Sequence, residues 1–90
     1  MAEASTITAI TLELDFVEAF ARTAQIAYSA GNAMKGNDAL RNAWGAWERA
    51  AKAVLTHEVE TLYSKLLELE ALLHVLESTP VRKNRLTKTI

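Results

Sequence analysis

The sequence contains no cysteine, a single proline and three glycines among its 90 residues. Without cysteine the chain forms neither disulfide bonds nor thiolate metal sites, a composition that fits the cytoplasm. No stretch reaches the ~20 consecutive apolar residues that a membrane-spanning helix requires. The N-terminal MAEASTITAITLEL also lacks the basic region and the continuous apolar core of a secretory signal. We therefore expect a soluble cytoplasmic protein with no membrane segment.

The chain also has little net charge of either sign. A formal charge of −1 at pH 7 argues against a generally basic nucleic-acid binder. Half of the residues are hydrophobic, and many of these are alanine or leucine, which both favour helix. The length and composition predict one all-α domain over residues 1–90, with a flexible N-terminus at 1–8 and a basic tail at 79–90.

The first predicted helix spans about 9–30. Its apolar residues recur every three or four positions, as on the buried face of a helix: Ile10, Leu14, Val17, Ala21, Ala24 and Tyr28. The start of this segment has a second interpretation, because residues 6–14 also alternate between apolar and polar as a strand does. A strand here followed by a helix from Phe16 is the alternative.

The second predicted helix is long, from 38 to 78. Gly31 suits the left-handed position after the first helix, and Asn37 or Asp38 suits an N-cap, so the two helices should form an antiparallel hairpin. Pro80 ends the second helix. Two apolar rows run along the long helix, and the row that flanks the main seam contains Tyr63, Leu67 and Leu72. Two such rows indicate more than one neighbouring helix.

The unequal lengths of the two helices predict an exposed leucine stripe. A helix of ~22 residues is about 33 Å long, whereas one of ~40 residues reaches about 60 Å. The uncovered part of the long helix would expose a large apolar patch, which a homodimeric bundle would bury. The predicted dimer or partner interface is Leu55, Val59, Leu62, Leu66, Leu69, Leu73 and Leu76. The alternative is a three-helix bundle with a break near Thr56–Glu58, although no glycine or proline stands there.

Trp44 and Trp47 are three residues apart and so share one helical face. One interpretation is an aromatic anchor for a partner, because tryptophan is enriched at binding hot spots. The favoured interpretation is core packing against the aromatic residues of the first helix, because both tryptophans lie on the apolar seam.

Two features favour nucleic acid as an alternative partner. The tail carries Arg82, Lys83, Arg85 and Lys88, which suit an anionic partner. Residues 9–55 also resemble the ribbon-helix-helix family in the order of their elements: strand ITLEL, helix FVEAFARTAQIAYSA, and a second helix around ALRNAW. That resemblance would imply DNA binding through a dimeric strand, but Thr11 and Glu13 on its polar face suit base edges poorly. Membership of the family is not inferred.

No motif in the sequence predicts catalysis, a cofactor or a metal. The pairs His57 with Glu60 and Glu70 with His74 have helical spacing, but a carboxylate-bridged metal site needs further ligands from a facing helix. Glu13 intrudes on the apolar face of the first helix, where an acid near a helix start favours the dipole. The expected function is therefore non-catalytic: a small intracellular regulator, inhibitor or adaptor that acts by binding a larger protein.

Overall fold

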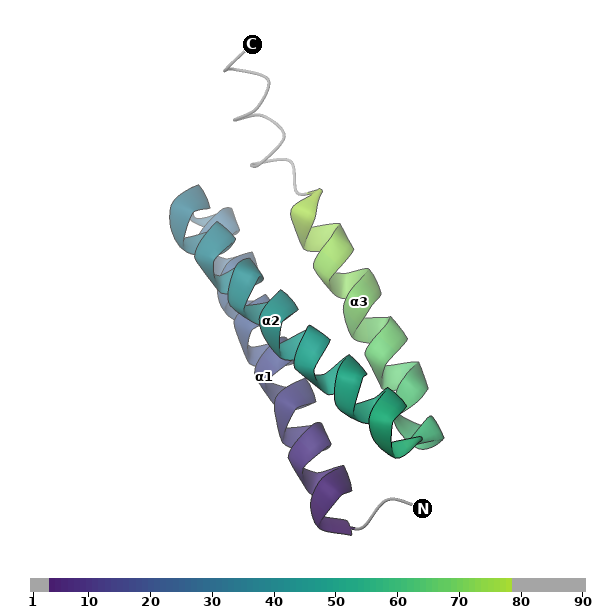
Figure 1. The fold of residues 1–90 in the computed structure, drawn as a ribbon. Coiled ribbons are helices and arrows are strands. Elements are labelled where there is room, and N and C mark those ends of the chain that lie inside the picture. Colours follow the sequence, from purple (N-terminus) through teal and green to yellow (C-terminus); the bar gives the residue numbers. More distant parts are fainter. Residues whose placement is uncertain (1–3, 79–90) are drawn as a thin grey trace.

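The structure, a computed structural model, describes residues 4–78 and places three α-helices around one core (Figure 1). Helix α1 spans Ala4–Ser29, α2 spans Ala33–His57, and α3 spans Tyr63–Glu77 after a single 3-10 turn, η1, at Glu60–Leu62. Consecutive helices run antiparallel, so α1 and α3 point the same way (Figure 1). The prediction of an all-α chain is confirmed for these residues, which contain no strand.

Helix α1 is continuous from Ala4, so the predicted first helix is confirmed, although it begins before residue 9, and the alternative of a strand at 6–14 is wrong. Ile10 and Leu14 both point into the core, which a strand starting at residue 6 would also allow. The next buried residue is Val17, and a step of three is helical rather than extended. The hydroxyl of Thr11 donates to the carbonyl oxygen of Ile7 at 2.8 Å, so this β-branched residue satisfies its polar group within the helix.

The turn between α1 and α2 is shorter than the sequence indicated. Gly31 adopts a positive φ of 80°, as predicted, and the amide of Asn32 donates back to the carbonyl of Ala27 at 2.8 Å. The side chain of Asn32 then caps α2 by accepting from the amide of Lys35 at 3.0 Å. Helix α2 therefore begins at Ala33 and not at 38, because Asn32 supplies the cap that was expected from Asn37 or Asp38.

Gly36, which the sequence placed in the loop, lies inside α2. A Cβ at this position would stand 2.5 Å from ring carbons of Tyr28, which is itself buried. The Tyr28 hydroxyl donates to the side-chain oxygen of Asn37. Gly36 thus permits the close approach that lets the end of α1 and the start of α2 pack around one aromatic ring.

The long second helix predicted from the sequence is wrong, and the break near Thr56–Glu58 is correct. Glu58 adopts the left-handed conformation at φ 53° and ψ 46°. The amide of Val59 donates to the carbonyl of Val54 at 3.0 Å, closing a six-residue Schellman turn at the end of α2. Val54 and Val59 are both buried, so the turn places two apolar side chains in the core. The chain reverses here, and α3 folds back beside α1 and α2.

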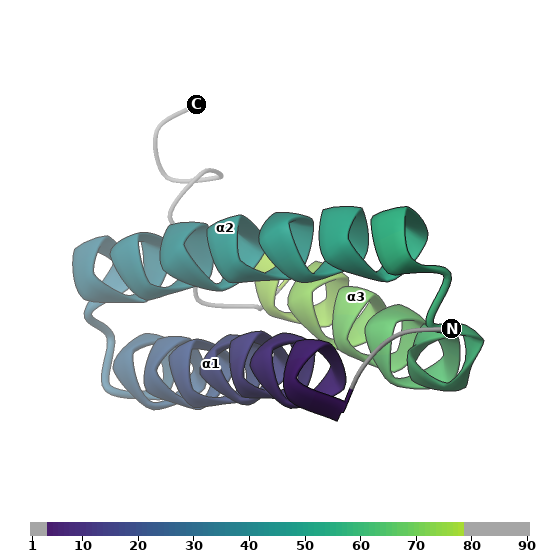
Figure 2. The ribbon, with the colours of Figure 1, turned by 60° about the horizontal axis from the view of Figure 1, so that its bottom comes forward.

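Helices α1 and α2 make the most extensive contact in the molecule, and α3 packs against both from one side (Figure 2). The α2 face toward α1 is built from alanine, which keeps bulky side chains out of the interface. Its fully or nearly fully buried residues recur at steps of four and three: Ala39, Ala43, Ala46 and Ala50.

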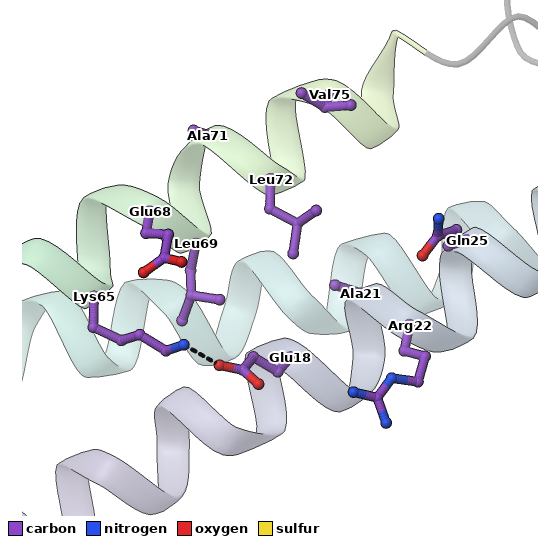
Figure 3. Close-up of a pocket in the computed structure, with 10 residues that line it drawn as sticks. All are labelled: Glu18, Ala21, Arg22, Gln25, Lys65, Glu68, Leu69, Ala71, Leu72 and Val75. Atoms are coloured by element: carbon purple, nitrogen blue, oxygen red, sulfur yellow. Dashed lines mark ion pairs between the residues drawn. The ribbon is translucent and has the colours of Figure 1, made fainter.

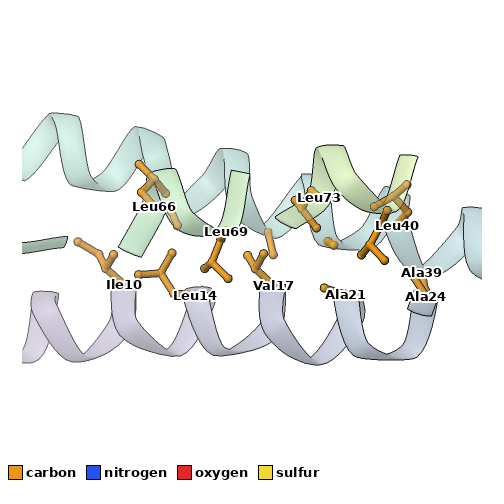
Figure 4. Packing of buried hydrophobic residues seen from close by; sticks show 14 of the residues in the cluster. Ile10, Leu14, Val17, Ala21, Ala24, Ala39, Leu40, Leu66, Leu69 and Leu73 are labelled. Atoms are coloured by element: carbon orange, nitrogen blue, oxygen red, sulfur yellow. The ribbon is translucent and has the colours of Figure 1, made fainter. Parts of the chain in front are cut away.

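Leucines of α3 close the core. Figure 4 shows Leu66, Leu69 and Leu73 pointing toward the α1 residues Ile10, Leu14 and Val17. All of them belong to one buried hydrophobic cluster, to which α2 also contributes. Each fully buried leucine stabilises the fold by about 1.5–3 kcal/mol, so α3 is a structural part of the bundle.

Candidate interaction surface

The predicted interface residues do not form an exposed stripe. Most of them lie in the core of the chain itself, each at most 6% exposed: Val59, Leu66, Leu69, Leu73 and Leu76. Leu62 is partly buried against the same cluster. Leu55 is separate from the others, 63% exposed on α2. The turn at Glu58 explains this outcome, because it brings the leucine stripe onto α1 and α2 of the same chain.

Trp44 and Trp47 hold α3 against α2. The indole nitrogen of Trp44 donates to a carboxylate oxygen of Glu77 at 2.7 Å, and that of Trp47 donates to the carbonyl of Leu66 at 2.8 Å. The two rings meet edge to face with centroids 5.6 Å apart, and the Trp44 ring also lies 5.0 Å from the ring of His74. The tryptophans are thus partly buried side chains that pack against the core and contact α3, the helix that the sequence had not separated.

Helix α3 is apolar on two opposite faces. At about 100° per residue, its buried leucines occupy an arc of roughly 80°, and a second arc of similar width lies on the far side of the helix. We call this second arc the outer face of α3; it consists of Ser64, Leu67, Ala71 and Val75. Leu67 is 61% exposed and Val75 is 65% exposed. An ordinary surface helix is polar on its outward side, so the outer face is an unpartnered apolar surface.

An open groove of about 530 Å³ runs beside the outer face, between α1 and α3. Figure 3 shows Leu72 of α3 pointing across the groove toward Ala21 of α1, and both residues line the groove. Val75 lines the groove as well, so the groove is continuous with the outer face of α3. Helix α1 packs far less extensively on α3 than on α2, and the groove lies where these two helices separate.

Of the charged side chains that line the groove, some form an ion pair and others do not. At one end Lys65 forms an ion pair with Glu18, which ties α3 to α1 across the gap (Figure 3). That hydrogen bond to Glu18 raises the pKa of Lys65 above its ordinary value of 10.5. Arg22 and Glu68 also line the groove, and neither forms an ion pair with any residue between 4 and 78.

Two of the remaining candidate groups, Glu13 and His74, have structural partners. Glu13 accepts from the Arg49 side chain at 3.1 Å, linking α1 to α2. His74 lies 3.5 Å from a carboxylate oxygen of Glu77, beside the Trp44 ring. Within residues 4–78 no three His, Asp or Glu side chains are grouped closely enough to hold a metal ion.

The basic tail residues Arg82, Lys83, Arg85 and Lys88 lie outside the described residues. Their share of the charge is nevertheless clear from the sequence. Residues 4–78 carry ten acidic and six basic side chains, a formal charge of −4, so the four basic residues of the tail balance the whole of this charge.

Comparison of the chain with protein-family models, with curated proteins and with solved structures gives no match. In the described part of the chain, no helix combines the length and the apolar character needed to cross a membrane.

The sequence predicted that the long helix over 38–78 has more than one neighbour, but the leucines expected to be exposed on it are mostly buried within the chain. Leu67 and Leu72 belong to the second apolar row that was seen beside the main seam, and Val75 was missed. The signal for the outer face was present in the low polarity of residues 62–76, which have few charged positions to cover an outward side. It became interpretable only after the chain reversal had shown which row was buried.

Proposed function

We propose that this protein is a non-catalytic protein–protein interaction module, a small regulator, inhibitor or adaptor that acts by binding another polypeptide. The observation that carries the proposal is the outer face of α3, where Leu67 and Val75 are more than half exposed beside an open groove lined by both apolar and charged side chains. The binding surface would be this face together with the groove between α1 and α3.

The shape of the surface favours a helical ligand. Two parallel helices with a groove of apolar floor and charged edges between them accept an amphipathic third helix, as in helix-in-groove recognition. The groove floor supplies contacts from Ala21 and Leu72, and the groove edges supply charges from Arg22 and Glu68. Such a ligand would complete a fourth helical position and cover Leu67 and Val75, whose exposure is otherwise unfavourable in water.

Site-specific photo-crosslinking in the native host tests this proposal. A photoreactive residue replaces Leu67 in one variant and Leu55 in a matched control, because the two leucines are equally exposed at 61% and 63% but lie on different helices. We expect a crosslinked polypeptide from position 67, absent from position 55, that disappears when Val75→Glu is added. Identical products from both positions, or none from position 67, would refute the proposed surface.

A nucleic-acid-binding role is the alternative, and it now rests on the tail alone. The N-terminal strand that would have read DNA is part of helix α1, and the bundle over residues 4–78 has a formal charge of −4, which repels phosphate. Salt-dependent binding to arbitrary DNA or RNA that is lost on deletion of residues 81–90 would support this alternative. Absence of binding at low salt would exclude it.

A further inference from the structure

We infer that the ligand of the α3 surface is the α3 helix of a second copy of this chain, packed antiparallel about a two-fold axis that passes beside Ala71. This inference rests on the proposed function, because it uses the same face. It assigns to that face a partner whose sequence is known, so the fit of the two surfaces can be examined residue by residue.

The outer face of α3 is self-complementary about Ala71. A two-fold axis between antiparallel helices places residues at equal distances from the axis opposite each other. With the axis at Ala71, Leu67 lies opposite Val75 of the second copy, and Ser64 lies opposite Ser78. Large apolar residues thus meet large apolar residues, and small polar residues meet at both ends. The small side chain at the centre allows the two helix backbones to approach closely.

The unpaired charges of the groove agree with the same arrangement. In Figure 3 Arg22 lies on α1 beyond Ala21, toward the Val75 end of the groove, with its side chain directed away from α3, whereas Glu68 lies nearer the opposite end, beside Lys65. In an antiparallel pair, Glu68 of the second copy is brought toward the Leu72–Val75 end of the groove, where Arg22 lies. The two-fold axis produces this contact twice. Each contact pairs Arg22 with Glu68, and neither side chain forms an ion pair with another residue between 4 and 78.

The size of the surface predicts a weak dimer. Helix α3 has 15 residues and so is about 22 Å long. A single helix pair of this length buries less than the ~800 Å² per partner of a standard interface, even with edge contacts from α1. We therefore expect a dissociation constant in the micromolar range. Sedimentation equilibrium of the full chain from about 1 µM to 1 mM covers this range.

Cysteine crosslinking tests the geometry directly, because the chain has no cysteine of its own. Ala71→Cys places one thiol per chain beside the proposed axis, and Ala19→Cys, on an exposed part of α1 outside the groove, is the matched control. Under mild oxidation we expect Ala71→Cys to form disulfide-linked dimers at least about tenfold faster than the control. Adding Val75→Glu should abolish this difference.

A charge exchange provides the second test. Arg22→Glu or Glu68→Arg alone should weaken the dimer by about two- to fivefold, and the double exchange should restore it. A mass of 9.9 kDa at every concentration, or equal crosslinking rates at positions 71 and 19, would overturn the homodimer. Crosslinking of a different protein at position 67 would then leave the proposed function standing with another ligand. If position 71 gives no excess of disulfide-linked dimers and position 67 gives no crosslinked polypeptide, the proposed function is wrong as well.

Discussion

Replacement of Glu58 by glycine distinguishes the three-helix bundle from one long helix, because it should change the free energy of unfolding in opposite directions in the two structures. Glu58 holds a left-handed conformation, φ 53° and ψ 46°, which costs an L-residue about 1–2 kcal/mol. Glycine removes this cost but gains freedom in the unfolded chain worth about 0.5–1 kcal/mol. Glu58→Gly should therefore increase the free energy of unfolding by about 0.5–1 kcal/mol. In a continuous helix the same glycine would decrease it by a similar amount, because glycine is a poor helix former.

Urea denaturation followed by circular dichroism measures this difference. A gain of 0.5–1 kcal/mol corresponds to about 2–8 °C in the melting temperature of a domain this small. Gly31→Ala is the matched control, because Gly31 has φ 80° and a Cβ added there would meet nothing within 4 Å. Alanine adds about 1–2 kcal/mol of backbone strain and removes about 0.5–1 kcal/mol of freedom from the unfolded chain, so the free energy of unfolding should fall by about 0.5–1 kcal/mol. A loss of stability in Glu58→Gly, with the expected loss in the control, would refute the chain reversal at this residue.

Two further substitutions test the core. Leu73→Ala should lower the free energy of unfolding by about 2–5 kcal/mol, because the side chain is fully buried within one chain. This loss, relative to the unsubstituted protein, should be the same at every protein concentration, and a loss that changes with concentration would place this leucine in an interface between chains. Gly36→Ala should destabilise the protein by about 1–3 kcal/mol, because the new Cβ would stand 2.5 Å from the ring of Tyr28. A more stable Gly36→Ala protein would contradict this packing, since helix propensity alone favours alanine by about 1 kcal/mol.

The free energies of backbone strain and of leucine burial explain why the chain folds back at Glu58, even though its sequence gives no strong break signal. The reversal costs about 1–2 kcal/mol in backbone strain at one residue. Against this cost, folding α3 onto the bundle buries Leu66, Leu69, Leu73 and Leu76, each at most 6% exposed. Each such burial contributes about 1.5–3 kcal/mol, so the total gain far exceeds the strain. A straight helix would need a second chain to bury the same leucines, with an additional entropic cost of association.

The two chain reversals also explain the limits of the sequence prediction. Both use the same Schellman turn, with Gly31 at the left-handed position in one and Glu58 in the other. Glycine at that position is a recognisable signal, and the left-handed residue of the first turn was predicted correctly. Glutamate there has no such signature, so residues 56–58 were identified only as an alternative break.

The identification of the proposed interaction surface also depended on the chain reversal at Glu58. Residue spacing alone shows that the region from Leu62 to Val75 has apolar residues on more than one side, and it shows that the chain is helical. Which side faces inward follows from the position of α3 relative to α1 and α2. Once Leu69 and Leu73 are buried, Leu67 and Val75 must face outward, because these positions lie on opposite sides of the helix.

By itself, the sequence determined the helical character of the chain, the buried face of α1, the turn at Gly31 and the absence of a recognisable catalytic motif, because these properties depend on local spacing and residue type. Only the tertiary structure decided the direction of α3, the role of the tryptophans and which apolar face of α3 is left exposed. The physical reason is that these features depend on a sum of burial energies across the whole bundle, which outweighs a local conformational cost at Glu58 that local sequence patterns do not reveal.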